Sequence, residues 1–294
     1  MSQSLEARPN GRPPLRPLLE TDRAELVRYL RQSPEENVYL LSRIALDGVV
    51  NEESVAHGRF YGQWQGDALL GVAFFGHRKG LTLTGESPEF LRGVTDLALG
   101  PESDWIVLVG PRGPVEGFLS HYRWRGRAMH LNRLQDFQVL TADTLGECGA
   151  AIRRAEPRDL EDVVEMSEQM LREDFDLPAG SLSREGIRES MRLKIRDGRT
   201  WVLDDPQGVV FKADVSAQYA GGAQVEGVFT RPDARGRGFA RRGMGALSAE
   251  LLRSSQFVTL HVDQRNDPAR RAYERAGFRT RAEFRLVLLA VAPR

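Results

Sequence analysis

The feature that most restricts the fold is a strand pattern at residues 227–230 that leads into a glycine-containing loop. The segment from residue 227 to residue 240 reads Gly-Val-Phe-Thr-Arg-Pro-Asp-Ala-Arg-Gly-Arg-Gly-Phe-Ala. Pro232 ends the strand, because proline has no amide hydrogen for a neighbouring strand. The spacing of apolar residues over 238–253 predicts a helix. The loop therefore lies at a helix N-terminus.

This loop has the chemistry of an anion site. The first amides of a helix have no partner inside it, and the helix dipole favours negative charge there. Gly236 and Gly238 let the main chain approach a bulky diphosphate. Five arginines accompany the loop, with Asp233 as their only nearby counter-charge in the sequence: Arg231, Arg235, Arg237, Arg241 and Arg242. We predict that the loop binds a multiply charged anion.

Two other phosphate-binding loops fit the sequence poorly. A P-loop needs Lys and then Ser or Thr after its second glycine, and here Phe239 and Ala240 follow. The dinucleotide fingerprint needs a third glycine at position 241, which is arginine. Both alternatives are excluded.

The pattern Arg-x-x-Gly-x-Ala at 235–240, after Val228 and Pro232, resembles the acetyl-CoA-binding motif of the GNAT superfamily of N-acetyltransferases. The stretch Asn266 to Phe278 resembles the second signature of that superfamily at the usual distance. This resemblance covers roughly residues 151–290. More narrowly, residues 210–215 and 224–228 resemble a bacterial group of two-domain GNAT proteins whose N-terminal domain has no settled function.

The resemblance implies a role for each matching residue. Main-chain groups of Val228, Phe229 and Thr230 would pair with the pantetheine arm of acetyl-CoA as an added strand. Asn266 would contact that arm, and Tyr273 would lie beside the thioester sulfur. The loop residues would hold the pyrophosphate, and they are Arg235, Gly236, Arg237, Gly238, Phe239, Ala240 and Arg241.

The implied reaction is direct transfer of the acetyl group from acetyl-CoA to a primary amine in a ternary complex. A base is needed, because an exposed alkyl amine keeps its proton up to about pH 10.4. Glu226, two residues before Val228, is expected on the same strand face. His261 on the next strand titrates in the useful range. Either residue is a candidate base, and either could equally be an ordinary strand residue.

Tyr273 is the candidate general acid. A phenol with a pKa of about 10 can hydrogen-bond and protonate a departing thiolate with a pKa of about 8.5. The competing interpretation is structural, since Tyr273 could fill a helix face together with Ala269, Ala272 and Ala276.

The chain of 294 residues is long enough for two domains. We expect a flexible leader over residues 1–15, an N-terminal domain over 16–145 and a catalytic domain over 150–294. The resemblance implies an α/β fold of two tandem GNAT-like domains, each a twisted mixed sheet flanked by helices. In the first domain the turn 110–114 occupies a strand–turn–helix position like that of the loop. It contains Pro111 and Pro114 and lacks the glycine pattern, so we expect a degenerate domain without a cofactor site.

The periodic patterns predict the elements of each half. In the first half we expect a helix after Thr21, a helical stretch over 38–44, a hairpin of 59–65 with 68–76, a strand over 105–109, a helix through Phe118 and Tyr122, and a strand over 137–140. In the second half we expect helices over 159–171, 184–195, 238–253 and 268–276, and strands over 200–203, 209–217, 224–230, 258–262 and 279–289.

Composition excludes several other classes. The 41 basic and 41 acidic side chains leave no basic excess, which argues against a general nucleic-acid binder. The longest apolar run, 286–292, is far shorter than the roughly 20 residues that span a bilayer. The single cysteine, Cys148, cannot form an internal disulfide, so we expect a cytoplasmic protein. Histidine and cysteine are too few and scattered to predict a metal site.

Two other functions stay open at this point. One is a non-catalytic acyl-CoA-binding or regulatory protein that keeps the loop without the chemistry. The other is an aminoacyl transferase of the tandem-GNAT type, which would bind aminoacyl-tRNA. For the acetyltransferase we expect a small-molecule or peptide amine as acceptor, and the residues specify neither its identity nor the oligomeric state.

Overall fold

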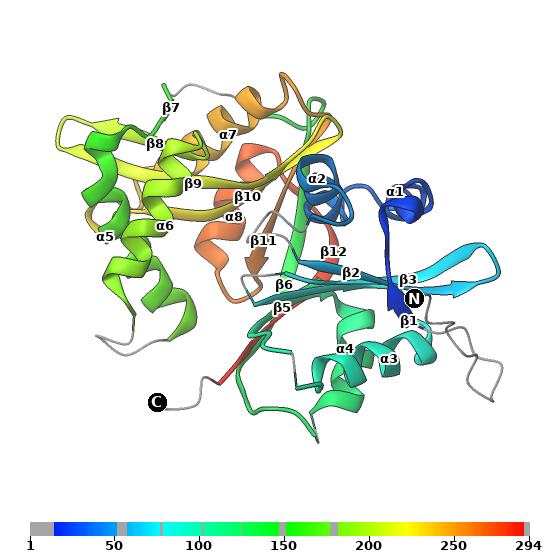
Figure 1. The fold of residues 1–294 in the computed structure, drawn as a ribbon. Coiled ribbons are helices and arrows are strands. Elements are labelled where there is room, and N and C mark those ends of the chain that lie inside the picture. Colours follow the sequence, from blue (N-terminus) through cyan, green and yellow to red (C-terminus); the bar gives the residue numbers. More distant parts are fainter. Residues whose placement is uncertain are drawn as a thin grey trace. The chain divides into compact units, whose positions relative to one another are not determined.

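The computed structural model describes residues 15–51, 58–76, 79–101, 103–123, 125–146, 151–176 and 182–290. Cys148 and residues 1–14 of the expected leader lie outside the described residues, and Leu15 already begins strand β1. The chain forms two compact units (Figure 1). The first unit comprises Met1–Gln135 with Glu283–Arg294, and the second comprises Asp136–Ala282.

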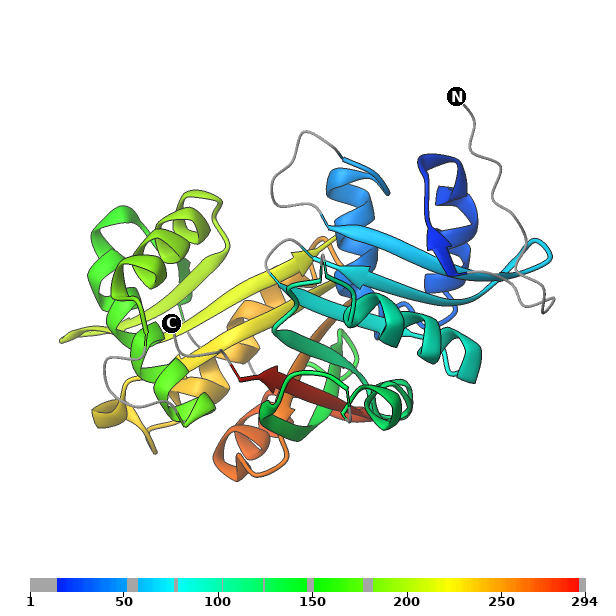
Figure 2. The same ribbon diagram turned by 60° about the horizontal axis from the view of Figure 1, so that its bottom comes forward.

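The first unit is a mixed sheet with helices on both faces. Its elements are β1 (Leu15–Pro17), α1 (Arg23–Leu30), α2 (Val38–Asp47), β2 (Arg59–Gln65), β3 (Ala68–Phe75), β4 (Gly80–Thr84), α3 (Pro88–Ala98), β5 (Val107–Pro111) and α4 (Arg112–Tyr122). Strands β1 to β4 are antiparallel neighbours, whereas β4 and β5 are parallel. Helices α3 and α4 pack side by side on one face (Figure 2), around a core that contains Phe90, Trp105 and Phe118.

The second unit repeats this order of elements. It contains β7 (Arg153–Arg154), α5 (Leu160–Phe175), α6 (Arg184–Arg196), β8 (Thr200–Asp205), β9 (Gly208–Gln218), β10 (Gly222–Thr230), α7 (Phe239–Leu251), β11 (Phe257–Asp263) and α8 (Asp267–Ala276). Strands β7 to β10 are antiparallel, and β10 and β11 are parallel with α7 between them in the chain. The predicted α/β class with mixed sheets is confirmed.

Two long strands cross the division between the units. Residues 136–141 of β6 (Met129–Thr141) belong to the second unit, where β6 lies next to β11. Residues 284–288 of β12 (Arg279–Leu289) pair with β5 in the first unit. The compact units therefore divide within β6 and β12, whereas the sequence patterns placed the boundary between residues 145 and 150. Local composition shows where a strand is, but not which distant strand it pairs with.

Most predicted elements are confirmed within a few residues, including all four helices of the second half. The sequence patterns indicated no bounds for β4 and α3, and β6 extends well before its predicted part at 137–140. Helix α3 begins at a clear cap, because Ser87 Oγ accepts a hydrogen bond from the amide of Phe90 and Pro88 follows the cap.

Strand β9 separates two different environments in the second unit. Phe211, Ala213 and Val215 belong to the apolar core that α7 and α8 cover. Lys212 and Asp214 alternate with them and face helix α6, whose Lys194 contacts Asp214. The apolar face fixes α7 closely, because a β-carbon at Gly243 of α7 would lie 2.5 Å from the Phe211 ring. This contact sets the position of the helix that follows the predicted loop.

Candidate functional site

The loop between β10 and α7 has the conformation that its glycines allow. A short 3-10 turn over Pro232–Ala234 is followed by Arg235 in an extended conformation. Gly236 and Gly238 have φ values of 74° and 79°, in the left-handed region where side chains are disfavoured. Gly238 is the N-cap of α7 and supplies no side-chain cap. The helix therefore begins with its first amides uncapped.

The amides of Gly236 to Arg241 are free. In the described part of the chain none of these six main-chain N–H groups has a hydrogen-bond acceptor, and the first bonded amide is that of Arg242. The space before them is open. A β-carbon at Gly236 would meet no atom within 4 Å, and one at Gly238 would meet only the Arg242 guanidinium at 3.3 Å. Six uncapped donors beside the open space at Gly236 and Gly238 have the chemistry that an anion site needs.

The arginines around this loop correct one expectation. Arg231 pairs with Asp233 as expected, but Arg235 pairs with Glu173 of α5 at 2.9 Å. Arg237 lies 3.4 Å from Asp205 at the end of β8. Glu173 and Asp205 are distant from the loop in the sequence. Asp233 is therefore one of three carboxylates that pair with the loop arginines, and not the single counter-charge that the sequence indicated. Arg241 is exposed and has no carboxylate partner among the residues described.

Strand β10 separates from β11 next to the loop. Its parallel pairing with β11 covers only Gly222 to Gln224, although both strands continue. Directly afterwards β10 has a bulge, in which three steps from Glu226 to Phe229 match two steps on β9. Gly227 adopts a φ of 59° there. The main chain of Val228 and its neighbours is therefore not paired with β11.

The bulge also corrects the predicted strand face. Strict alternation put Glu226 and Val228 on one face, but Val228 packs against the core under α7 and α8. Glu226 instead points towards α6, where its Oε1 lies 2.9 Å from Lys194 Nζ. The extra residue at Gly227 reverses the alternation, which a period of two cannot anticipate.

Tyr273 lies on α8 in the same apolar core as Val228 and Ala240. Its side chain is buried, and burial together with the negative charge of Asp174 raises the pKa of the phenol above its usual 10. The phenol is therefore protonated throughout the neutral range. Asn266 is the N-cap of α8, where its Oδ1 accepts from the amide of Ala269 over 3.2 Å. That cap uses the oxygen of the Asn266 side chain but not its amide hydrogens.

The two candidate bases lie on the face away from α8. His261 alternates on β11 with Leu260 and Val262, which belong to the core under α7 and α8. Its ring contacts Phe137, with the ring centroids 5.2 Å apart. Burial lowers the pKa of His261 to about 4. The imidazole is therefore neutral at pH 7, but it holds an acquired proton weakly.

The structure corrects the choice of the corresponding turn in the first unit. By order of elements, the turn between the parallel strands β4 and β5 that enters α3 matches the loop between β10 and α7. This turn is Gly85, Glu86 and Ser87, not the segment 110–114. Ser87 Oγ accepts from the amide of Phe90, and Pro88 has no amide hydrogen. A β-carbon added to Gly85 would lie 2.6 Å from Gly71 Cα. This turn therefore lacks the row of free amides and the open glycine positions of the loop between β10 and α7.

Comparison with known proteins gives one match that lies mostly within the second unit and several over nearly the whole chain. The family model of FR47-like proteins matches residues 213–287, from β9 through the loop and α8 into β12. Among curated proteins none matches the sequence significantly. Several solved structures match nearly the whole chain. A GCN5-related N-acetyltransferase from Sphaerobacter thermophilus has a TM-score of 0.57 at 16% identity, covering 93% of this chain and 94% of its own.

Two further structures cover 95% of this chain and 99% of their own. A tandem GNAT protein from the clavulanic acid biosynthesis pathway has a TM-score of 0.52 at 13% identity. A Drosophila protein has a TM-score of 0.66 at 15% identity. The chain has the tandem GNAT fold. At these sequence identities the similarity shows the fold and does not show the activity.

The resembling residues all lie in the second GNAT unit. The free amides, the bulged strand and Tyr273 fall within the stretch that the family model matches. Lys194, which holds Glu226, was missed by sequence reasoning because it comes from α6, outside the two signatures. No group of three or more possible metal ligands was found among the residues that the structure describes. In the same residues, no helix is long and apolar enough to cross a bilayer.

Proposed function

We propose that the protein transfers an acetyl group from acetyl-CoA to a primary amine of a small molecule or peptide in the cytoplasm. One observation carries the proposal: the six free amides of Gly236 to Arg241, which face open space at the N-terminus of α7. Such donors suit a pyrophosphate, because each can hydrogen-bond an oxygen and the helix dipole adds favourable charge. Arg241 would add a cation at the rim of this site.

The thioester arm would lie along β10. After Gln224 this strand no longer pairs with β11, so an extended pantetheine chain could take the place of the neighbouring strand. Val228 and Phe229 would supply main-chain partners. The carbonyl of Thr230 already accepts a hydrogen bond from Arg235 Nε over 3.1 Å. Thr230 would therefore contribute its main-chain N–H group.

Tyr273 would act on the leaving group. The neutral amine attacks the thioester carbonyl, the C–N bond forms, the C–S bond breaks, and the thiolate accepts a proton from the phenol. The raised pKa of Tyr273 keeps the phenol protonated at neutral pH but also makes it a weaker acid, so its hydrogen bond to the developing thiolate would contribute more than the proton transfer itself. An amide of the bulged strand near Val228 would stabilise the carbonyl oxygen as it gains charge.

Glu226 is the better supported base. Its side chain is half exposed and can reach an acceptor through water, while Lys194 fixes its position. His261 is the weaker candidate, because burial disfavours the positive charge that its imidazole would gain, whereas the Glu226 carboxylate is half exposed. The proton of the acceptor amine would pass to the Glu226 carboxylate and from there to solvent.

The test is a thiol-release assay with acetyl-CoA against polyamines, amino acids, aminoglycosides and peptide N-termini. We expect release with at least one amine class. Tyr273→Phe should lower kcat by about 10²-fold or more and leave CoA affinity near the wild-type value. Tyr122→Phe, which changes a buried tyrosine of the first unit, is the matched control and should keep full activity.

A second candidate function is a non-catalytic acyl-CoA-binding protein. The observation that favours it is the state of the two candidate bases, since Glu226 is ion-paired and the pKa of His261 is low. CoA binding without thiol release across the amine panel would select this function. Absence of CoA binding would remove both.

A further inference from the structure

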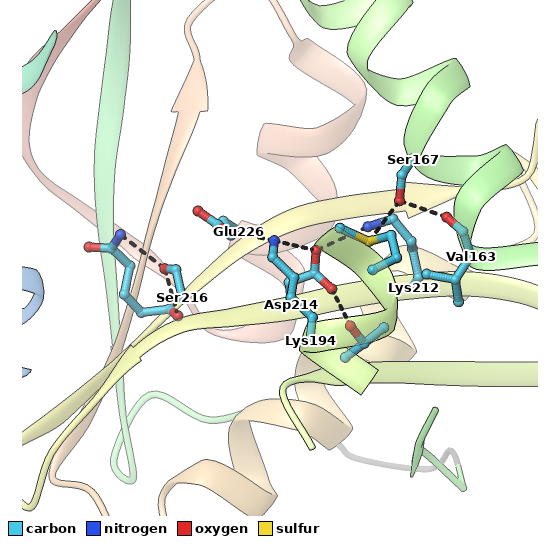
Figure 3. A network of polar contacts seen from close by, with 10 residues as sticks. Val163, Ser167, Lys194, Lys212, Asp214, Ser216 and Glu226 are labelled. Carbon is cyan, nitrogen blue, oxygen red and sulfur yellow. Dashed lines mark hydrogen bonds and ion pairs between the residues drawn. The ribbon is translucent and has the colours of Figure 1, made fainter. Parts of the chain in front are cut away.

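A buried ionic cluster lies directly beneath the bulge of β10 (Figure 3). We define it as Lys194, Lys212 and Asp214. The side chains of Lys212 and Asp214 are 0% and 2% exposed. Asp214 Oδ2 accepts from Lys212 Nζ at 3.2 Å and from Lys194 Nζ at 3.1 Å, and Asp214 Oδ1 accepts from Thr200 Oγ1 at 2.8 Å. The carboxylate therefore has a partner on each oxygen.

The cluster contacts the bulge at Gly227, the residue with the positive φ. A β-carbon added to Gly227 would lie 2.6 Å from Asp214 Oδ2 and 3.3 Å from Lys212 Nζ. The main chain of the bulge therefore packs directly against the side chains of Asp214 and Lys212. Lys194 then joins the cluster to Glu226, which is paired with Asp214 across the two strands. The residues before and within the bulge are held from one side by the same three side chains.

Burial of these charges needs a reason other than stability. Moving charged groups out of water costs several kcal/mol each, and a well-packed apolar replacement is often equally stable or more so. What such a cluster supplies is a defined geometry, because each partner has to meet the others at hydrogen-bond distance. Here the geometry that it defines is that of the strand segment that leaves β11.

We propose that Lys194, Lys212 and Asp214 are positioning residues that fix the bulged segment of β10 for the thioester arm of acyl-CoA. The inference rests on the proposed function, since it assigns the cluster to the same strand. The inference predicts that two parts of acyl-CoA are bound by different parts of the protein. The pyrophosphate meets the loop of Gly236 to Arg241, which the cluster does not touch, whereas the pantetheine arm meets the segment that the cluster supports.

Calorimetry with two ligands tests this division. CoA carries both parts, and 3′-phosphoadenosine 5′-diphosphate carries the pyrophosphate without the arm. We expect Lys194→Gln to weaken CoA binding by about tenfold and to leave the affinity for 3′-phosphoadenosine 5′-diphosphate within about twofold. Lys194→Arg, which keeps a cation in reach of both carboxylates, should restore most of the CoA affinity.

The control is Arg192→Gln on the same helix. Among the residues that the structure describes, Arg192 pairs with Glu189 alone, on the surface, so its loss should change neither affinity. Asp214→Asn is the second variant, of equal size, and should repeat the Lys194→Gln pattern while the melting curve confirms a folded protein. Unchanged CoA affinity in both cluster variants, or equal weakening of both ligands, would overturn the inference. If the wild-type protein bound neither ligand, the proposed function itself would fail.

Discussion

The amide of Arg242 donates to the carbonyl of Gly238 over 3.1 Å, and this is the first main-chain hydrogen bond of helix α7. The six preceding amides, Gly236 to Arg241, are left without acceptors among the residues described. The proposed anion site therefore depends on main-chain geometry, and we expect the glycines that permit this geometry to matter more than any one arginine. Arg235 and Arg237 are already engaged with Glu173 and Asp205.

Gly243→Ala should displace the helix that carries this site. Its new β-carbon would lie 2.5 Å from a carbon of the Phe211 ring, and both residues are buried. Overpacking of this kind costs about 1 to 3 kcal/mol of unfolding free energy, which urea unfolding would measure. CoA affinity should fall as well, because the N-terminus of α7 moves.

Gly186→Ala is the matched control for that change. Gly186 lies in the first turn of α6, is exposed, and would place its β-carbon at an ordinary 3.4 Å from Ser183 Oγ. Alanine there should stabilise the protein by about 0.5 to 1 kcal/mol. Equal stability of the Gly243→Ala protein and the wild type would contradict the contact with Phe211.

Lys212→Met should destabilise the second unit. The ammonium is fully buried and lies 3.2 Å from Asp214, so its removal leaves a buried carboxylate with one cation fewer. Loss of one partner from a buried pair costs about 3 kcal/mol or more. Chemical denaturation would measure this as a lower midpoint. Arg192→Met, which removes an exposed cation from α6, should leave the midpoint unchanged, and a similar shift in both proteins would count against the role of burial.

His261 should make the stability depend on pH. Burial lowers its pKa from 6.5 to about 4, so between these values the unfolded chain binds a proton that the folded protein does not. The contribution is complete above pH 6.5 and is lost as the pH falls towards 4. It amounts to roughly 3 kcal/mol. His261→Gln should flatten the dependence of unfolding free energy on pH in this window, and an unchanged slope would show that His261 is accessible to protons in the fold.

The elements of the site were predictable because each carries a local signal. Pro232 ends a strand, two glycines mark the loop, and Asn266 with Gly277 marks both ends of α8. These signals act within a few residues and survive any tertiary arrangement. They are sufficient for the loop and for the position of Tyr273 in the core.

The parts that failed depend on distant partners. The face of Glu226 was predicted wrongly, because β10 has a bulge at Gly227, which lies against Asp214 on another strand. Glu173 and Asp205 neutralise loop arginines from elements far away in the sequence. The strand that completes the first unit comes from the end of the chain. Such pairings depend on the whole fold and cannot be predicted from a short segment of sequence.

Main-chain recognition of the CoA pyrophosphate at the start of α7 is the claim on which the proposed function depends. The direct measurement is titration calorimetry of CoA with the wild type, Gly238→Asp and Gly66→Asp. Gly66 in the hairpin of the first unit also has a positive φ, 59°, and a β-carbon there would meet no atom within 4 Å, so it controls for the substitution itself. We predict one site in the wild type, binding at least about tenfold weaker in Gly238→Asp through charge repulsion, and wild-type affinity in Gly66→Asp. Equal CoA affinity in all three proteins would contradict recognition at this loop.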